Sequence, residues 1–454
     1  MKKILSVLSI AALSMSLVAC GDSSDSKKEA EGKEKITIKY ANWNVNVQEE
    51  VSLERLMIEE YEKQNKNIDI VIDETIDPTD YVGSLAAAAS AGQLPDVFMI
   101  ENIPTALAND WLMDIAEYTK KDNEWESISA PVRENVQFGE KIYAVPFAQH
   151  MLGYYINKDL FNSENIDIPS YGWSIDEFTS SVKSLTNAKK NIIGLGNVDS
   201  VVDWYPAVAN DKLGYYTWDG EKYHLNSKEF TAGVNLAREL SRNSYVFENL
   251  DADAKAKFDG EFPSDAFKAG QIGIQWDGSW AITDLTDLAS IEWDYIGVPG
   301  GKNIIANDYL GVSATTKEAQ ASYDFAKWMS HSKEGFFKRL ELAEANDKAL
   351  NTLPLSTDEE VLEKYFATVN VPGLEVAYEN IDKAIVEPVK TVPGYLDARW
   401  NASTGVKIAD KDNATIGDLI FNSLHGDVKI EDYANQLNEL ANKKNKEAKE
   451  FLGQ

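Results

Sequence analysis

The sequence predicts an α/β fold with two lobes. Segments with the apolar–polar alternation of strands take turns with segments of helical spacing, and the same order restarts after residue 161. The body that follows the first 35 residues is long enough for two domains, because 44% of the chain is hydrophobic and 10% is aromatic. We expect each lobe to hold a mostly parallel sheet flanked by helices.

The N-terminus has the pattern of an export signal. Lys2 and Lys3 precede an apolar run over residues 4–17, which ends in Leu-Val-Ala before Cys20. This run is shorter than the about 20 residues that a membrane-spanning helix needs. Residues 1–19 are therefore predicted to be a signal peptide.

Cys20 is the only cysteine, so no intramolecular disulfide can form. Its position after Leu-Val-Ala resembles the lipobox of bacterial lipoproteins, which implies that Cys20 is acylated after signal cleavage. The alternative is an incidental free thiol. The polar residues 21–35 cannot form a core. Residues 20–35 are thus expected to be a lipidated cysteine and a flexible tether of some 20 Å.

The first lobe is predicted from a strand–helix–strand–helix–strand order. The five segments lie at residues 35–43, 51–65, 68–76, 80–93 and 95–102. This order favours parallel strands, and a ligand crevice lies beyond the carboxyl ends of such strands. Those ends are Asn42-Trp43-Asn44 and Glu101-Asn102.

The second lobe repeats the pattern. Helical spacing at 174–185 and 231–243 alternates with apolar strand segments at 191–196 and 271–276. Two lobes with facing crevices predict a small-molecule site in the cleft between them.

Four blocks of sequence carry a family resemblance. They are "AGQLPDVFMIEN" at 91–102, "YAVPFAQHMLGYYINKDLF" at 143–161, "FKAGQIGIQWDGSW" at 267–280 and "LGVSATTKEAQASYDFAKWMSH" at 310–331. In order and spacing the chain resembles the extracellular solute-binding proteins of ABC importers, in the sugar-binding family that includes maltodextrin-binding proteins. The resemblance implies a periplasmic-binding-protein (Venus flytrap) fold, capture of a sugar by lobe closure, and no catalysis or cofactor.

The resemblance also implies that the chain crosses between lobes more than once. Lobe 1 is expected to contain residues 36–147 and 300–350, and lobe 2 residues 148–299 and 351–454. The crossings are expected near 146–148, near 299–308 and after Thr352-Leu353-Pro354.

The stretch around residue 280 is the main candidate for sugar contact. The family pattern of Phe-x-x-Gly, an apolar strand and Gly-x-Trp falls at Phe267, Gly270, Gly278 and Trp280. A sugar ring has an apolar face and a rim of hydroxyls, so a flat aromatic ring beside hydrogen-bonding groups matches it. We expect Trp280 to be the platform, Gly278 to let the backbone approach the ligand and Asp277 to accept hydrogen bonds from two sugar hydroxyls. Trp276 is a further candidate, and packing in the core is the alternative for both tryptophans.

Strand ends and family positions supply the other candidates. They are Trp43, Asn44, Asn102, Gln149, His150, Asp203, Trp204, Arg399 and Trp400. His150 stands where relatives often carry a carboxylate or another polar ligand group. The alternatives are a helix N-cap for Asn102, a structural or simply exposed histidine at His150, the core for Trp43, and helix packing for residues 203–204 and 399–400.

The net charge and the absence of known motifs argue against a nucleic-acid-binding protein and against several classes of enzyme. A formal net charge of −30 repels phosphate backbones, so nucleic acid is not expected as a partner. The sequence contains no P-loop, Gly-x-Ser-x-Gly or His-Glu-x-x-His motif, and no spaced cysteine or histidine cluster, so no metal site is predicted. A surface glycosidase with two carboxylates remains the alternative enzyme. A surface adhesin and a peptide or polyamine receptor are alternative binders.

The predicted partners are a sugar and a membrane permease. Several candidate aromatic platforms favour an oligosaccharide over a single ring. We expect a monomer on the extracellular face of a bacterial cell membrane, held there by its lipid anchor.

Overall fold

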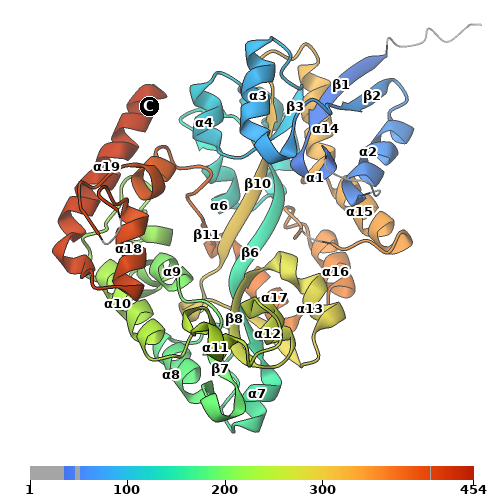
Figure 1. The fold of residues 1–454 in the computed structure, drawn as a ribbon. Coiled ribbons are helices and arrows are strands. Elements are labelled where there is room, and N and C mark those ends of the chain that lie inside the picture. Colours follow the sequence, from blue (N-terminus) through green and yellow to red (C-terminus); the bar gives the residue numbers. More distant parts are fainter. Residues whose placement is uncertain (1–34, 47–51, 351, 409–410, 454) are drawn as a thin grey trace, which may run out of the picture. The chain divides into compact units, whose positions relative to one another are not determined.

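A computed structural model describes residues 35–453 except 47–51, 351 and 409–410 (Figure 1). The predicted signal peptide, Cys20 and all of the tether but Lys35 lie outside the described residues. The described residues from Ile36 onward form one compact unit, the body. No helix within the described ranges is both long and apolar enough to cross a bilayer.

The first lobe begins with the predicted alternation of strands and helices. Its elements are β1 (Ile36–Ala41), α1 (Trp43–Asn46), α2 (Leu53–Gln64), β2 (Ile68–Ile72), α3 (Tyr81–Ser90) and β3 (Val97–Ile100). Strands β2, β1 and β3 are parallel neighbours. Helix α2 begins where the Ser52 hydroxyl accepts from the Arg55 N–H, and its apolar side chains are buried. The α/β class is confirmed.

Two long strands run through the middle of the body (Figure 1). Strand β6 (Val145–Asn157) and strand β10 (Ile304–Val312) are antiparallel to each other, and β10 is also antiparallel to β3. The sheet order is β2-β1-β3-β10-β6-β8-β7. The pairing of β10 with β6 shifts register between Asn307 and Tyr309, which places Asp308 in a bulge.

The second lobe continues this sheet. Its strands are β7 (Ile193–Leu195), β8 (Ile272–Gly278) and β9 (Trp293–Gly297), and the short β11 (Ile385–Val386) pairs with β10. Strand β7 is parallel to β8, as a strand–helix–strand unit requires. Helices α8 (Ile175–Leu185) and α10 (Lys228–Arg242) lie where the helical spacing predicts them.

The remaining elements complete the two lobes. They are α4 (Ile103–Ala108), α5 (Ala116–Thr119), α6 (Ala130–Asn135), β4 (Gln137–Phe138), β5 (Lys141–Ile142), α7 (Lys158–Ser163), α9 (Ser200–Ala209), α11 (Ala252–Lys255), α12 (Pro263–Lys268), α13 (Ile282–Leu288), α14 (Ala319–Met329), α15 (Lys333–Ala345), α16 (Glu359–Thr368), α17 (Pro372–Tyr378), the π-helix η9 (Asp397–Asn401), α18 (Ile416–His425) and α19 (Ala434–Phe451).

The apolar side chains form two clusters. One gathers around β1, β3 and α14, and the other around α8, α9, α10 and α18. Buried residues between 353 and 384 join the first cluster, whereas those from Val392 to Ala441 join the second. Strands β6 and β10 contribute side chains to both clusters. The exact lobe boundaries stay a prediction.

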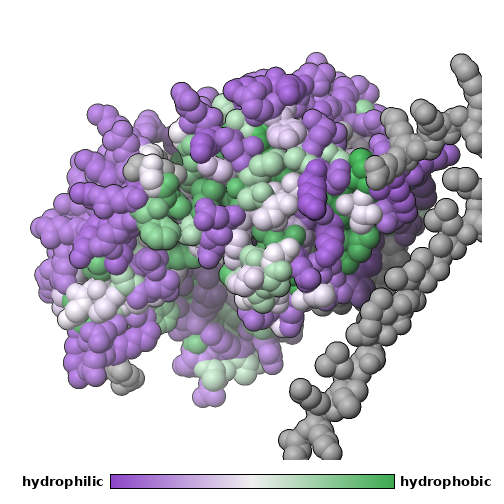
Figure 2. Space-filling view, turned by 90° about the horizontal axis from the view of Figure 1, so that it is seen from above, coloured by the Kyte–Doolittle hydropathy of each residue, from purple (hydrophilic) through white to green (hydrophobic). Residues whose placement is uncertain are grey.

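Polar residues cover most of the surface in the view from above, and hydrophobic residues show chiefly in hollows between them (Figure 2). Exposed large apolar side chains are therefore informative. Among the described residues, only two tryptophans are exposed. They are Trp280 and Trp400, with 46% and 52% of their surface exposed.

Candidate functional site

The exposed ring of Trp280 lies flat against a glycine. Strand β8 ends at Gly278, and a Cβ added there would stand 2.5 Å from each of three neighbouring carbons of the indole six-membered ring. Equal distances to three atoms of one ring place that point over the ring centre. One ring face is thus covered by the Gly278 backbone, and the side chain stays half exposed. This is the arrangement that a stacking platform requires.

Polar groups flank the Trp280 ring. The His150 ring lies edge-on to it, with 5.1 Å between ring centroids. The Asp277 carboxylate accepts from the Gly278 N–H at 2.8 Å and from the Trp280 side chain. Burial lowers the pKa of His150 to about 4 and raises the pKa of Asp277. At neutral pH His150 is therefore an uncharged imidazole beside an aromatic ring.

A second group forms around Trp400. The Arg399 guanidinium donates to the Asp203 carboxylate at 2.6 Å and to the Tyr395 hydroxyl at 2.7 Å. The same guanidinium lies 4.8 Å from the centroid of the Trp400 ring. The Trp400 ring also packs against Gly417 of α18, where a Cβ would come within 2.4 Å of it. The structure thus brings Asp203, Arg399 and Trp400 together.

The segment 387–391 connects the two groups, and sequence reasoning missed it. Lys390 donates to Asp308 at 2.5 Å, and both charges act on His150. Glu387 has no ion-pair partner within the described residues, although it interacts electrostatically with Lys390, Asp203, Asp308 and Arg399. Burial raises the pKa of Glu387 to about 7, and the neighbouring carboxylates add to the shift.

This segment is held against the first lobe. The Asn102 side chain donates to the Val389 carbonyl at 2.9 Å, and the Ile103 N–H donates to the Lys390 carbonyl at 2.9 Å. Asn102 also caps α4, because its Oδ1 accepts from the Thr105 N–H at 3.0 Å. The N-cap interpretation of Asn102 is confirmed. Its side-chain amide also holds the segment 387–391 in place.

Other sequence candidates lie apart from a ligand surface. Trp204 is fully buried and its Nε1 donates to the Tyr154 hydroxyl at 3.0 Å, so it belongs to the second core instead of an exposed platform. Gln149 is also buried, and its Nε2 donates to the Pro354 carbonyl and the Tyr378 hydroxyl. Both side chains are buried and hydrogen-bonded to other residues, and their role in ligand contact stays a prediction.

The last three candidates have mixed surroundings. Trp276 is partly buried and packs edge-on against Tyr154 at 5.2 Å. Trp43 begins α1 and packs edge-on against Tyr81 at 5.2 Å, while the neighbouring Asn44 is exposed. Within the described ranges, no hydrogen bond or ring contact joins Trp43 or Asn44 to Trp280 or Trp400. Their role in ligand contact stays a prediction.

Buried polar atoms near the site lack partners. Among the residues that the structure describes, these include His150 Nδ1, Arg399 Nε and both polar atoms of the Asn307 amide. Buried groups of this kind are rare in folded proteins because each costs free energy.

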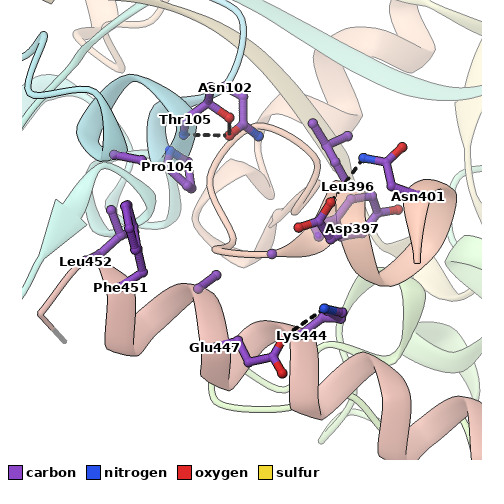
Figure 3. Close-up of a pocket in the computed structure, with 14 residues that line it drawn as sticks. Asn102, Pro104, Thr105, Leu396, Asp397, Asn401, Lys444, Glu447, Phe451 and Leu452 are labelled. Atoms are coloured by element: carbon purple, nitrogen blue, oxygen red, sulfur yellow. Dashed lines mark hydrogen bonds and ion pairs between the residues drawn. The ribbon is translucent and has the colours of Figure 1, made fainter. Parts of the chain in front are cut away.

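A pocket of about 400 Å³ opens beside η9 (Figure 3). Asn102, Pro104 and Thr105 line it from the side of α4, while Asp397 and Asn401 of η9 and the end of α19 line the rest. Asn401 follows Trp400 directly, so the pocket borders the Trp400 group. Its lining mixes apolar side chains with amides and carboxylates, as sites for small polar molecules do.

The site has the chemistry of binding. Its aromatic rings, carboxylates and amides offer flat faces and hydrogen-bond partners to a polyhydroxylated molecule. No group of three or more histidine, cysteine or acidic residues within the described ranges is placed to hold a metal ion.

Residues 45–335 match the family of bacterial extracellular solute-binding proteins. The protein belongs to this family. The match spans more than half of the chain and includes β3, β6, β8 and the Trp280 turn. The family assignment confirms the expected class of binding protein, which acts outside the cytoplasm.

Solved structures of solute-binding proteins have the same fold. An ABC substrate-binding protein from Listeria monocytogenes, in complex with cycloalternan, is 21% identical with a TM-score of 0.66 and covers 92% of this chain and 100% of its own. A sugar transporter protein from Rhizobium etli, in an open conformation, is 17% identical with a TM-score of 0.68 over 89% and 99%. A cyclic α-maltosyl-1,6-maltose binding protein from Arthrobacter globiformis is 16% identical with a TM-score of 0.65 over 91% and 100%. The chain therefore has the two-lobed solute-binding fold.

Proposed function

We propose that this protein captures an oligosaccharide between its lobes and delivers it to the permease of an ABC importer. The observation that carries the proposal is the half-exposed Trp280 ring, which is seated on Gly278 and bordered by Asp277 and His150. An indole face matches the apolar face of a pyranose, and the flanking groups match its hydroxyls.

Three further observations support a sugar longer than one ring. Trp400 is a second exposed ring, and the Asp203–Arg399 ion pair beside it and Glu387, which interacts electrostatically with both residues, carry hydrogen-bonding groups. The neighbours of the same fold are described with cycloalternan and with cyclic α-maltosyl-1,6-maltose. Both are oligosaccharides, which agrees with two aromatic platforms.

The proposal includes closure and anchoring. Ligand that contacts both lobes at once favours the closed state by its difference in affinity for the two states. The mature protein is a monomer tethered to the membrane through acylated Cys20, which keeps the receptor beside its permease.

A thermal-unfolding screen tests the proposal. The mature chain is melted with panels of mono- and oligosaccharides, amino acids, peptides and polyamines. A ligand at 100 times its Kd adds about 2.7 kcal/mol to the free energy of unfolding, so one sugar series should raise Tm by several degrees. W280A should lose that shift, while F262A, which removes an exposed ring just before α12 and outside the site, should keep it.

Two results would contradict the proposal. Stabilisation by amines or peptides alone would assign the acidic groups Asp203, Glu387 and Asp308 to a cationic ligand. Chromatography of the sugar after long incubation addresses the glycosidase alternative, because shortened products would show catalysis.

A further inference from the structure

Helix α18 presents an aromatic face beside Trp400. Gly417, which supports the Trp400 ring, is followed by Phe421 and His425 at intervals of four residues, so the three lie on one face of the helix. Phe421 has 60% of its surface exposed. Successive positions are about 6 Å apart along the helix axis, which is comparable with the length of one pyranose unit.

The Phe421 ring is held in place. It packs against the His425 imidazole with 4.4 Å between ring centroids. His425 is itself fixed, because its Nδ1 lies 3.1 Å from the Ser241 hydroxyl and its Nε2 lies 3.9 Å from Asp199. Phe421 is therefore an ordered apolar surface, and such a surface binds with less loss of side-chain entropy than a free one.

A hollow of about 420 Å³ lies next to this ring. Its lining includes Asp199, Glu248, Asn249, Phe421 and His425. Burial raises the pKa of Asp199 and of Glu248, and Asn197 donates to Glu248 at 2.8 Å. The lining thus combines an aromatic face with carboxyl and amide groups, which is the same combination as at Trp280.

Asp199 relates this hollow to the group around Trp400. It is the N-cap of α9 and stands four residues before Asp203, which binds the Arg399 guanidinium that lies over Trp400. Asp199 interacts electrostatically with His425 on one side and with Asp203 and Arg399 on the other. A ligand that leaves Trp400 along α18 therefore meets Phe421 next.

We propose that Phe421, His425 and the adjoining hollow form an outer subsite for sugar units that extend beyond Trp400. This inference rests on the proposed function and deepens it, because it assigns a chain length to the ligand. The occupant is the continuing end of the same oligosaccharide. Each further unit up to this subsite then adds contact area and affinity.

The test compares affinities along one sugar series. Titration calorimetry measures the unaltered protein, F421A and F421L against maltose to maltoheptaose, or against the homologous series that gives the largest shift in the screen. A single aromatic contact of about 0.5–1.5 kcal/mol corresponds to a roughly 2- to 13-fold change in Kd. F421A should bind the longer sugars more weakly by about this factor and the shortest sugar with unchanged affinity. F421L should show part of this loss of affinity.

Controls separate this subsite from general damage. F262A removes another exposed phenylalanine and should leave every Kd unchanged, whereas W400A should weaken short and long sugars alike. Melting temperatures of all variants establish that they are folded.

Some negative results would overturn the outer subsite alone, and another would overturn the proposed function as well. Equal affinities of F421A and the unaltered protein at every length would overturn the outer subsite alone, and so would a uniform loss at all lengths. Binding of a monosaccharide without gain from longer chains would also overturn it. If no sugar of any length binds the unaltered protein, the proposed function falls first and the subsite falls with it.

Discussion

Each exposed tryptophan of the site rests against a glycine. Gly278 lies under the ring of Trp280, and Gly417 lies against the ring of Trp400. Neither glycine has a positive φ, so the reason for glycine here is close approach and not backbone conformation. The glycine and the ring act as a unit, in which a side chain at one position would displace the other.

We expect G278A to weaken sugar binding about tenfold, because the new Cβ would overlap the Trp280 ring and move it. The measurement is the Kd of G278A, W280A and the double variant. Since both changes act through one ring, G278A should cost little in the W280A background. Additive losses would show that Gly278 acts on binding independently of the ring.

Glu387 should make stability fall with rising pH. Its pKa is 4.5 in the ordinary case and about 7 in the folded protein. Between these values the folded state holds the proton more tightly, so the stabilising contribution is full below pH 4.5 and is lost as the pH rises through 7. E387Q should therefore gain stability over the unaltered protein as the pH rises, by up to about 3 kcal/mol at pH 8.

Urea unfolding of both proteins at several pH values measures this difference. E363Q, which changes an exposed glutamate of α16, serves as the control and should give parallel curves. A difference between E387Q and the unaltered protein that does not change with pH would contradict the prediction.

His150 should make stability fall with decreasing pH, opposite to the effect of Glu387. Its pKa falls from 6.5 to about 4, so its contribution is full above pH 6.5 and is lost as the pH falls through 4. H150Q should therefore reduce the loss of stability that the protein suffers in acid. Tm measured from pH 3.5 to 7 checks this, and an unchanged acid slope in H150Q would count against a buried neutral imidazole.

At the level of elements, the segment 387–391 joins parts of the chain that are far apart in sequence. Its carbonyl groups accept from Asn102 and Ile103 at the start of α4, and its Lys390 pairs with Asp308 on β10. Asn102 is therefore both a helix cap and a tie between elements.

Two substitutions separate the roles of Asn102. N102A removes the cap and the bond to Val389 and should cost about 1–3 kcal/mol in the free energy of unfolding. N102D keeps a capping oxygen but loses the donor to Val389, so it should cost less than N102A. The control N109A changes an exposed residue at the other end of the same helix and should stay within about 0.5 kcal/mol. Equal costs for N102A and N102D would mean that the cap contributes nothing.

At the level of the whole molecule, β6 and β10 contribute to both hydrophobic clusters. Movement of one lobe against the other must therefore bend these strands or the segments that follow them. The register shift at Asp308 lies on β10 in this region. A bulge is a place where a strand can bend without breaking a regular ladder.

We expect ligand to make the body more compact. Small-angle X-ray scattering should show a smaller radius of gyration with a saturating sugar than without it. W280A at the same sugar concentration should keep the larger radius. No change in radius for a sugar that raises Tm would mean that binding occurs without closure.

Local patterns were sufficient for much of this structure. Periods of two and of 3.6 residues predicted β1, α2, β2, α3 and β3 in order, because both periods report which face of a segment is buried. The Trp280 turn was also visible in the sequence, since the strand, the glycine and the ring lie within a few residues of one another. The sequence left Trp204 open between ligand contact and helix packing, and in the structure its ring packs in the second core.

The sequence by itself determined the α/β class, the family and the turn that carries the exposed Trp280. Only the tertiary structure decided which distant side chains meet: Arg399 pairs with Asp203 across 196 positions, and Asn102 reaches Val389 across 287. It also decided that Gln149 is committed to the core and that Glu387 stands among the charges of the site. The physical reason is separation along the sequence. Burial periodicity is a property of neighbouring residues, whereas these ion pairs and hydrogen bonds depend on how the chain brings remote segments together.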